Sequence, residues 1–84
     1  MKIEVASKRG KTTVRLSGQF QTEQIAELKK QLLDHGARLV LDLTEVTVVD
    51  VEVVRYLGAC VASGMKIVNC PRYIREWMNR ERKP

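Results

Sequence analysis

The stretch from Arg38 to Asp50, RLVLDLTEVTVVD, constrains the fold more than any other part of the sequence. Its first half, Arg38 to Leu43, predicts a buried strand, because apolar residues fall on both faces of the pleat and need cover on each side. Asp42 lies near the end of this strand. Asp50 precedes a second apolar segment, Val51 to Val61, and an Asp there is a good helix N-cap because its carboxylate accepts hydrogen bonds from unpaired backbone N–H groups. The stretch therefore predicts a strand, a turn and a capped helix.

Length and composition limit the chain to one small domain. With 84 residues, of which 44% are hydrophobic, residues 1–84 predict a single α/β domain. A domain of this size buries roughly 60% of its unfolded surface, in one compact core. The sequence has no run of about 18 apolar residues that could span a membrane, and its start lacks the apolar centre of a signal peptide. We therefore expect a cytoplasmic protein that does not span a membrane.

The net charge of +5 is concentrated toward the C-terminus. From residue 65 onward six bases face two acids, and residues 79–84 are expected to form a basic tail. Such a tail can attract nucleic acid, anionic lipid or an acidic protein, although a solvated, frayed end explains the same charges. Nucleic-acid binding is disfavoured, because the rings available for stacking, Tyr73 and Trp77, lie on the apolar side of their segment.

No group of residues has the spacing of a catalytic or metal site. Cys60, Cys70 and His35 are not spaced as metal ligands, so the cysteines predict reduced structural thiols, with no disulfide and no metal. Four carboxylates lie close together in sequence: Asp42, Glu45, Asp50 and Glu52. No partner base or glycine-rich phosphate loop accompanies them. We therefore expect no enzyme activity and no cofactor.

The rest of the chain predicts a mixed sheet with helices packed against it. Alternating apolar and polar residues around a turn at residues 7–11 predict an N-terminal hairpin. A first helix is expected from Thr22, which serves as its cap, to His35 and Gly36 at its end. A short strand is expected at residues 65–69, followed by a third helix with Pro71 in its first turn. The order β-β-α-β-α-β-α predicts about four strands, antiparallel at first and joined by right-handed crossovers afterwards.

The spacing of apolar residues marks the helix faces that turn inward. The first helix presents a stripe of Ile25, Leu28 and Leu32, with Ala26 and Leu33 beside it. The helices that start near Thr22 and Asp50 are expected to cover one face of the sheet. The expected core consists of Leu16, Ile25, Leu28, Leu32, Leu39, Leu41, Leu43, Val54, Leu57 and Ile67.

Several of these residues together resemble the STAS domain, which is shared by anti-sigma factor antagonists and the cytoplasmic parts of sulfate transporters. The resemblance rests on Gly18 after a strand, LDLTEV at 41–46, VVD at 48–50, Leu57, and GMKI at 64–67. It covers roughly residues 3–74, and its most specific part is the pattern D-L-[ST]-x-V followed shortly by [IV]-D. The resemblance implies a small sheet with helices packed against it, in a module that binds protein partners rather than transforming a substrate.

The chain departs from the family at the residue that follows Asp50. Phosphorylated members carry a Ser or Thr at the position of Val51, where a phosphoryl group repels the partner. Val51 has no hydroxyl, so this comparison with the family implies binding that is independent of phosphorylation at this site. Glu52 adds a fixed negative charge one residue later. That charge either imitates the phosphorylated state or is simply stabilised by the positive, N-terminal end of the helix dipole.

Two binding functions fit the resemblance. The first is a regulatory adapter similar to an anti-sigma factor antagonist, whose partner would be an anti-sigma factor-like kinase with an ATPase fold. The second is an accessory subunit bound to the ATPase of a lipid-transporting ABC system, because single STAS proteins also resemble such subunits. The sequence does not separate these two functions.

The surface expected to bind the partner is the loop at residues 44–52 with the exposed side of the helix that follows. Its candidate residues are Thr44, Thr47, Asp50, Val51, Glu52, Arg55 and Tyr56. Arg55 and Tyr56 are the expected anchors, because Arg and Tyr are over-represented among binding hot spots. Thr44 and Thr47 are also candidate phosphate acceptors, although a Thr in a turn commonly bonds its own backbone.

The C-terminal segment offers a second candidate interface. Tyr73, Trp77 and Met78 share one side of the third helix with Ile74. In one interpretation this side packs on the sheet, which would bury one of the largest apolar side chains of a small domain. In the other, the helix detaches and binds a protein partner or a second copy of the chain, which would form a homodimer.

Overall fold

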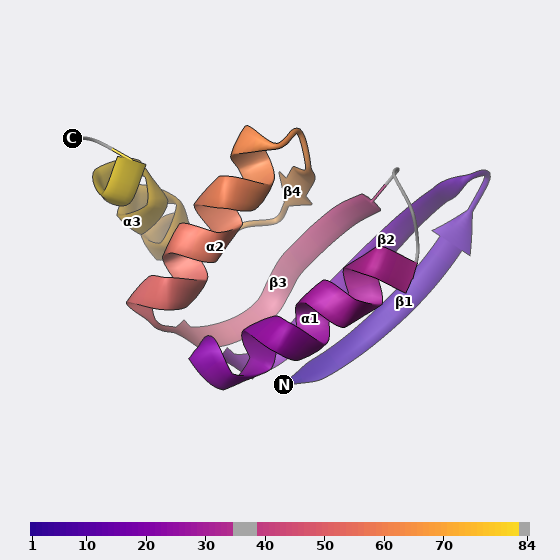
Figure 1. Cartoon of the computed structure of the whole chain (residues 1–84), viewed down its shortest axis with the longest axis horizontal. Helices are drawn as coiled ribbons and strands as arrows, with labels where there is room; N and C mark the ends of the chain where they lie inside the picture. Colours follow the sequence, from indigo (N-terminus) through magenta and orange to yellow (C-terminus); the bar gives the residue numbers. More distant parts are fainter. Residues whose placement is uncertain (35–38, 83–84) are drawn as a thin grey trace.

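The computed structural model describes residues 1–34 and 39–82, and these follow the predicted order of strands and helices (Figure 1). The elements are β1 (Lys2–Lys8), β2 (Lys11–Phe20), α1 (Thr22–Asp34), β3 (Leu39–Val49), α2 (Val51–Ala62), β4 (Lys66–Val68) and α3 (Arg72–Arg82). Within the described residues, four strands form one sheet in the order β1-β2-β3-β4. β1 pairs antiparallel with β2, whereas β2 with β3 and β3 with β4 pair in parallel. The predicted mixed α/β sheet is therefore confirmed.

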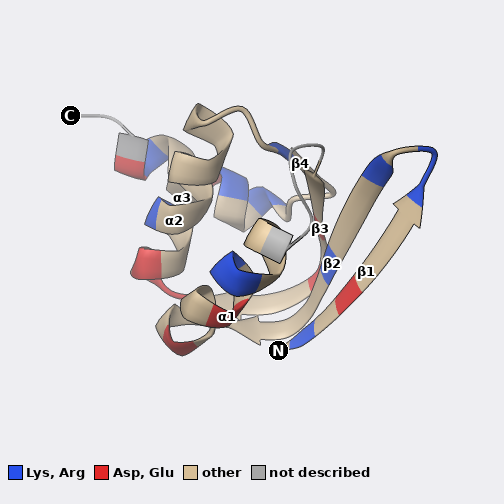
Figure 2. Ribbon diagram, turned by 45° about the vertical axis from the view of Figure 1, so that its right-hand side comes forward, with Lys and Arg blue, Asp and Glu red and all other residues tan. Residues whose placement is uncertain are grey.

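One face of the sheet carries the core. α1 and α2 cover this face, and α3 packs against α2 (Figures 1 and 2). The buried side chains that meet there are Val14, Leu16, Phe20, Leu28, Leu32, Leu39, Leu41, Leu43, Val46, Val49, Val53, Val54, Leu57 and Ile74. Because alternate residues of a strand point to opposite faces, Thr13, Arg15 and Asp42 lie on the other face.

Most of the predicted core is buried, but the edges of the α1 stripe are not. Eight of the ten predicted core residues are buried, whereas Ile25 and Ile67 are only partly buried. Leu33, expected beside the stripe, has 83% of its surface exposed, and Ala26 is exposed as well. Successive side chains on a helix point about 100° apart. Leu32 points into the core, so the next residue, Leu33, points toward the outer side of α1. The prediction for Leu33 and Ala26 is therefore wrong.

β3 is longer than the sequence predicts. The expected loop over residues 44–52 is not found in the described structure, because β3 continues from Leu43 to Val49 and α2 starts at Val51. After Leu43 the buried residues are Val46 and Val49, spaced by three rather than two. This spacing breaks the alternation that identifies a strand, so the sequence pattern places the end of the strand at Leu43.

Two β-bulges explain the spacing of three. Arg15 pairs with Asp42 and Ser17 with Glu45, so β3 has one more residue than β2 between these pairs. The same happens between Gly18 and Gln19, and each extra residue re-aims the side chains that follow. Gly18 lies between the two bulges with φ at +85°, a conformation that glycine adopts readily and that other residues rarely do.

The ends of the helices agree in part with the predictions. Asp50 caps α2 with an extended backbone, and Gly64 follows the end of that helix with φ at +99°. α3 begins at Arg72, immediately after Pro71, and extends to Arg82, so part of the segment expected as a basic tail is helical. The predictions for His35, Gly36 and Arg38 concern positions outside the described residues.

Candidate protein-interaction surface

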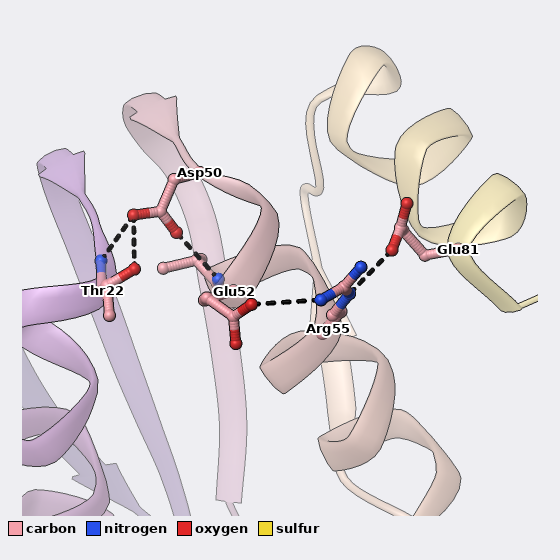
Figure 3. A network of polar contacts seen from close by, with 6 residues as sticks. Thr22, Asp50, Glu52, Arg55 and Glu81 are labelled. Carbon is pink, nitrogen blue, oxygen red and sulfur yellow. Dashed lines mark hydrogen bonds and ion pairs between the residues drawn. The ribbon is translucent and has the colours of Figure 1, made fainter.

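Asp50 joins the first turns of α1 and α2 (Figure 3). Its Oδ1 accepts from the backbone N–H of Val53 at 3.0 Å, which is the predicted N-cap bond. Its Oδ2 accepts from both the backbone N–H and the hydroxyl of Thr22, each at 2.7 Å. These bonds, the Thr22 hydroxyl first, hold the pKa of Asp50 below its usual value, although partial burial opposes them. Both carboxylate oxygens are thus engaged within the chain.

The link between Thr22 and Asp50 was not visible in the sequence. Thr22 was expected to cap its own helix, but it is the first residue of α1 and its hydroxyl bonds Asp50 instead. The reciprocal bond at this helix start comes from Gln24, whose side chain accepts from the backbone N–H of Gln21 at 2.9 Å. A polar residue at a helix start predicts a capping bond, but the sequence does not show which group its side chain will bond.

Arg55 links α2 to α3. Its Nε donates to Oε1 of Glu81 at 2.9 Å, and its Nη1 donates to Oε1 of Glu52 at 3.1 Å (Figure 3). Glu81, which the sequence analysis did not single out, is the first of these partners in raising the pKa of Arg55. All three side chains remain accessible to solvent. The predicted anchor Arg55 is therefore exposed and held in one geometry by two carboxylates.

Tyr56 faces α1 rather than α3. Its ring lies under the ammonium group of Lys29, with 5.5 Å between Nζ and the ring centroid, and it is partly buried. Burial raises the pKa of Tyr56, and the nearby Cys60 adds to the effect. A groove of about 350 Å³ adjoins it, lined by Lys29, Leu32, Leu33, Leu39, Tyr56 and Met65. The two predicted anchors thus contact different neighbouring helices and do not form one patch.

Thr44 and Thr47 lie on the exposed second half of β3. The backbone N–H and hydroxyl of Thr44 both donate to Oδ1 of Asp42, at 2.9 and 2.5 Å. Asn69 donates to the same oxygen at 3.3 Å, and Nε of Arg15 lies 3.7 Å from Oδ2. These contacts, above all that of the Thr44 hydroxyl, keep the pKa of Asp42 below its usual value against the opposing effect of burial. Asp42, 6% exposed, thus joins β2, β3 and the segment after β4.

The second predicted interface contacts the first. Tyr73 is 46% exposed and its hydroxyl donates to the backbone carbonyl of Thr47 at 3.0 Å. Thr47 has no partner in the register of β3 with β2 or β4, so Tyr73 bonds a residue that no strand pairs with in the described structure. Ile74 is fully buried, and Trp77 and Met78 pack against the core. The structure therefore has α3 packed, with Tyr73 as its exposed apolar residue.

Val51 and Glu52 occupy the first turn of α2. Val51 is partly buried, and Glu52 is exposed beside the N-terminal end of the helix, where a negative charge is favourable. We group them with Thr47, Arg55 and Tyr73, which lie on the second half of β3, on α2 and on α3 and are linked by the contacts of Arg55 with Glu52 and of Tyr73 with Thr47. We call this the α2–α3 surface. Tyr56 lies apart from it, toward α1.

No helix in the described residues is long and apolar enough to cross a membrane. Those residues also bring together no group of three or more His, Cys, Asp or Glu that could hold a metal ion.

Comparison with known proteins assigns the family. No curated protein matches the chain. A family model described as "Mlab, STAS domain" matches residues 3–72, from β1 to the start of α3. Proteins with this domain are in general regulatory protein-interaction modules rather than enzymes. The chain therefore belongs to the STAS domain family.

Proposed function

We propose that this STAS domain is a constitutive, non-enzymatic subunit that binds the ATPase of a lipid-transporting ABC system through the α2–α3 surface. One observation carries this: Asp50 is engaged within the chain, and the residue that follows it at the start of α2 has no hydroxyl that could be phosphorylated. Asp50 uses both oxygens on Thr22 and Val53, and the next residue, Val51, has no hydroxyl. A subunit that stays bound needs no switch at this position.

An antagonist that exchanges partners has a different requirement. Its release depends on a charge added beside the Asp, which a phosphoryl group supplies to a Ser or Thr. Val51 cannot accept a phosphoryl group. The resemblance at Asp50 nevertheless keeps a phosphorylation-independent antagonist, bound to an anti-sigma factor-like kinase, as the second candidate. The absence of the hydroxyl favours the permanent subunit.

The geometry of Arg55 suits a binding anchor. Its guanidinium is exposed, yet Glu52 and Glu81 hold it in place from two sides. A side chain that is already ordered loses less conformational freedom when a partner binds. We therefore expect Arg55 and Glu52 to contribute most to the polar contacts of the α2–α3 surface, with Tyr73 as its aromatic contact.

Calorimetric titration with purified partners tests this function. The chain should bind the ABC ATPase and not the kinase, and Arg55→Ala should weaken binding about tenfold or more, as expected for a hot-spot residue. Arg72 and Glu76 on α3 form a similar exposed pair, with Nε of Arg72 3.1 Å from Oε1 of Glu76. Arg72→Ala is therefore the matched control and should leave the affinity unchanged.

The same titrations identify the outcomes that contradict the proposal. Binding to the kinase alone would favour the antagonist function, and a Val51→Ser variant would then be expected to accept phosphate and release the kinase. If Arg55→Ala and Glu52→Lys both leave the affinity for the ATPase unchanged, the α2–α3 surface is not the binding site. Circular dichroism of each variant checks that the fold is retained.

A further inference from the structure

The tip of the β1–β2 hairpin is basic and lies far from the α2–α3 surface. Figure 1 shows the hairpin extending away from the helices, and Figure 2 shows basic residues gathered at its turn. Arg9 and Gly10 form that turn with φ at +53° and +77°. Two positive φ values are typical of the tight two-residue turns that match the twist of a hairpin. The bases at the tip are therefore held by regular structure.

The register brings these bases together on the sheet face that no described helix covers. Lys8 pairs directly with Lys11, and Ala6 pairs with Thr13. Both pairs lie on the face opposite the core, because the neighbouring Val14 belongs to the buried side. An open depression of about 600 Å³ lies here, lined by Ala6, Lys8, Arg9, Lys11 and Thr13. We call it the hairpin depression.

The charges around the hairpin depression are not balanced. Among the described residues, Lys8, Arg9 and Lys11 form no ion pair. Two acids on the same face already lie beside other bases: Glu4 lies 4.0 Å from Lys2, and Asp42 lies 3.7 Å from Arg15. Like charges that face each other across two strands are destabilising. The pairing of Lys8 with Lys11 therefore maintains a repulsion that a bound anion would relieve.

We propose that the hairpin depression binds phosphate groups, either of a free phosphate compound or of a phospholipid headgroup. A phosphate carries up to two charges and several acceptor oxygens, so it matches three cations that line one depression better than a single carboxylate does. Arg9 can bond two phosphate oxygens at once. Ala6 and Thr13, the next pair on this face, also line the depression: Ala6 has a small side chain, and Thr13 has a hydroxyl that can donate.

Titration of ¹⁵N-labelled protein with inorganic phosphate, at constant ionic strength, tests this site. We expect amide shifts confined to the hairpin, and a weaker response to glutamate, whose carboxylates replace the phosphate. Replacing three bases with Lys8→Gln, Arg9→Gln and Lys11→Gln should weaken phosphate binding by about tenfold or more, because these residues supply the charge of the site. A matched variant with Lys30→Gln, Arg75→Gln and Arg80→Gln loses the same net charge elsewhere and should bind phosphate normally.

Vesicles separate the two sources of phosphate. Co-sedimentation with phosphatidylglycerol in phosphatidylcholine vesicles, but not with phosphatidylcholine alone, would identify a headgroup site. Hairpin shifts with inorganic phosphate and no co-sedimentation would identify a free phosphate ligand. Absence of both responses would overturn the proposal, as would glutamate binding as tightly as phosphate. Equal losses in the two triple variants would show that only net charge matters and would also overturn it.

Thermal unfolding provides a readout that a purely structural hairpin would not show. Phosphate should raise the midpoint of the unmodified chain and not that of the hairpin triple variant, because a ligand that binds only the folded state stabilises it. At low salt without phosphate, Lys11→Gln should raise the midpoint by removing the repulsion from Lys8. A lower midpoint for Lys11→Gln would contradict the unbalanced charge on which the site depends.

Discussion

The two halves of β3 differ in how their side chains reach the core. From Leu39 to Leu43 every residue is buried, with Leu39, Leu41 and Leu43 on the helix-covered face. In the second half only Val46 and Val49 are buried, while the residues between them are exposed. The first half pairs with strands on both sides, whereas the second pairs with β2 alone in the described structure.

This difference in strand pairing and burial leaves the second half of β3 with an exposed surface. The first half holds the sheet together, and its aspartate, Asp42, accepts from Asn69 on one oxygen and forms an ion pair with Arg15 on the other. The second half has a free edge, which Tyr73 covers at one carbonyl. The residues proposed to bind a partner lie along this half and the helix that follows. Each of the following predictions tests one side of this comparison.

The largest effect is expected in the first half. Leu41→Ala should lower the free energy of unfolding by about 2–5 kcal/mol, because it removes buried methyl groups and leaves a cavity. In the second half, Val48 is 42% exposed, and Val48→Ala should change stability by less than about 0.5 kcal/mol. Urea denaturation followed by the fluorescence of Trp77 measures both. Equal effects would mean that the two halves do not differ in burial.

A smaller effect is expected at the bulges of the second half. Gly18→Ala should cost about 1–2 kcal/mol, because an alanine is strained at φ +85°. Gly58→Ala is the matched control: Gly58 lies within α2 and has open space around its Cβ position. That change should raise stability by up to about 1 kcal/mol, since alanine favours a helix over glycine. If Gly18→Ala costs nothing, the bulges do not require this backbone conformation.

Asp50→Ala should cost about 0.5–2 kcal/mol, the usual loss for a helix N-cap. Asp50→Asn keeps a capping oxygen and should cost less. The fluorescence of Trp77 during urea denaturation again reports the loss. A larger cost for Asp50→Asn than for Asp50→Ala would contradict the capping role.

Lowering the pH should reduce the stability that ionised Asp42 and Asp50 give to the fold. The native state lowers the pKa of Asp42 and of Asp50, so the stability from their ionised forms is present above the unfolded value of about 3.9. It is lost as the pH falls through the lower native values. The unfolding free energy should therefore decrease below about pH 4, and it should decrease less steeply in Asp50→Asn. An identical pH dependence in that variant would show that Asp50 is not stabilised as an anion.

The smallest effect on stability is expected from the exposed network on α2 and α3. Arg55→Ala should destabilise the chain slightly at low salt and not measurably at high salt, because salt screens exposed ion pairs. Thermal unfolding at two salt concentrations measures this. A large, salt-independent loss would mean that the link from Arg55 to Glu81 is part of the structural framework.

The sequence predicted some residues of the site through local chemistry. Asp50 was predicted to be an N-cap because a carboxylate just before an apolar helical segment commonly caps that helix. The hydrogen bond from the backbone N–H of Val53 to Asp50 confirms this prediction. The bonds from Thr22 to Asp50 and from Arg55 to Glu81 were not predicted, because the partners lie 28 and 26 residues apart in the chain. Arg55 and Tyr56 are neighbours in sequence, yet they contact different helices. Sequence adjacency does not show whether two side chains share a surface.

The sequence alone determined the order of strands and helices, the apolar stripes that form most of the core, and the absence of a hydroxyl on Val51, the residue after Asp50. These features follow from local periodicity and residue type, and the tertiary structure agrees with them. Only the tertiary structure decided the extent of β3, the opposition of Lys8 and Lys11, and the contacts that join α3 to α2 and β3. Each of these depends on strand register or on the packing of distant segments, and neither is encoded in the spacing of nearby residues.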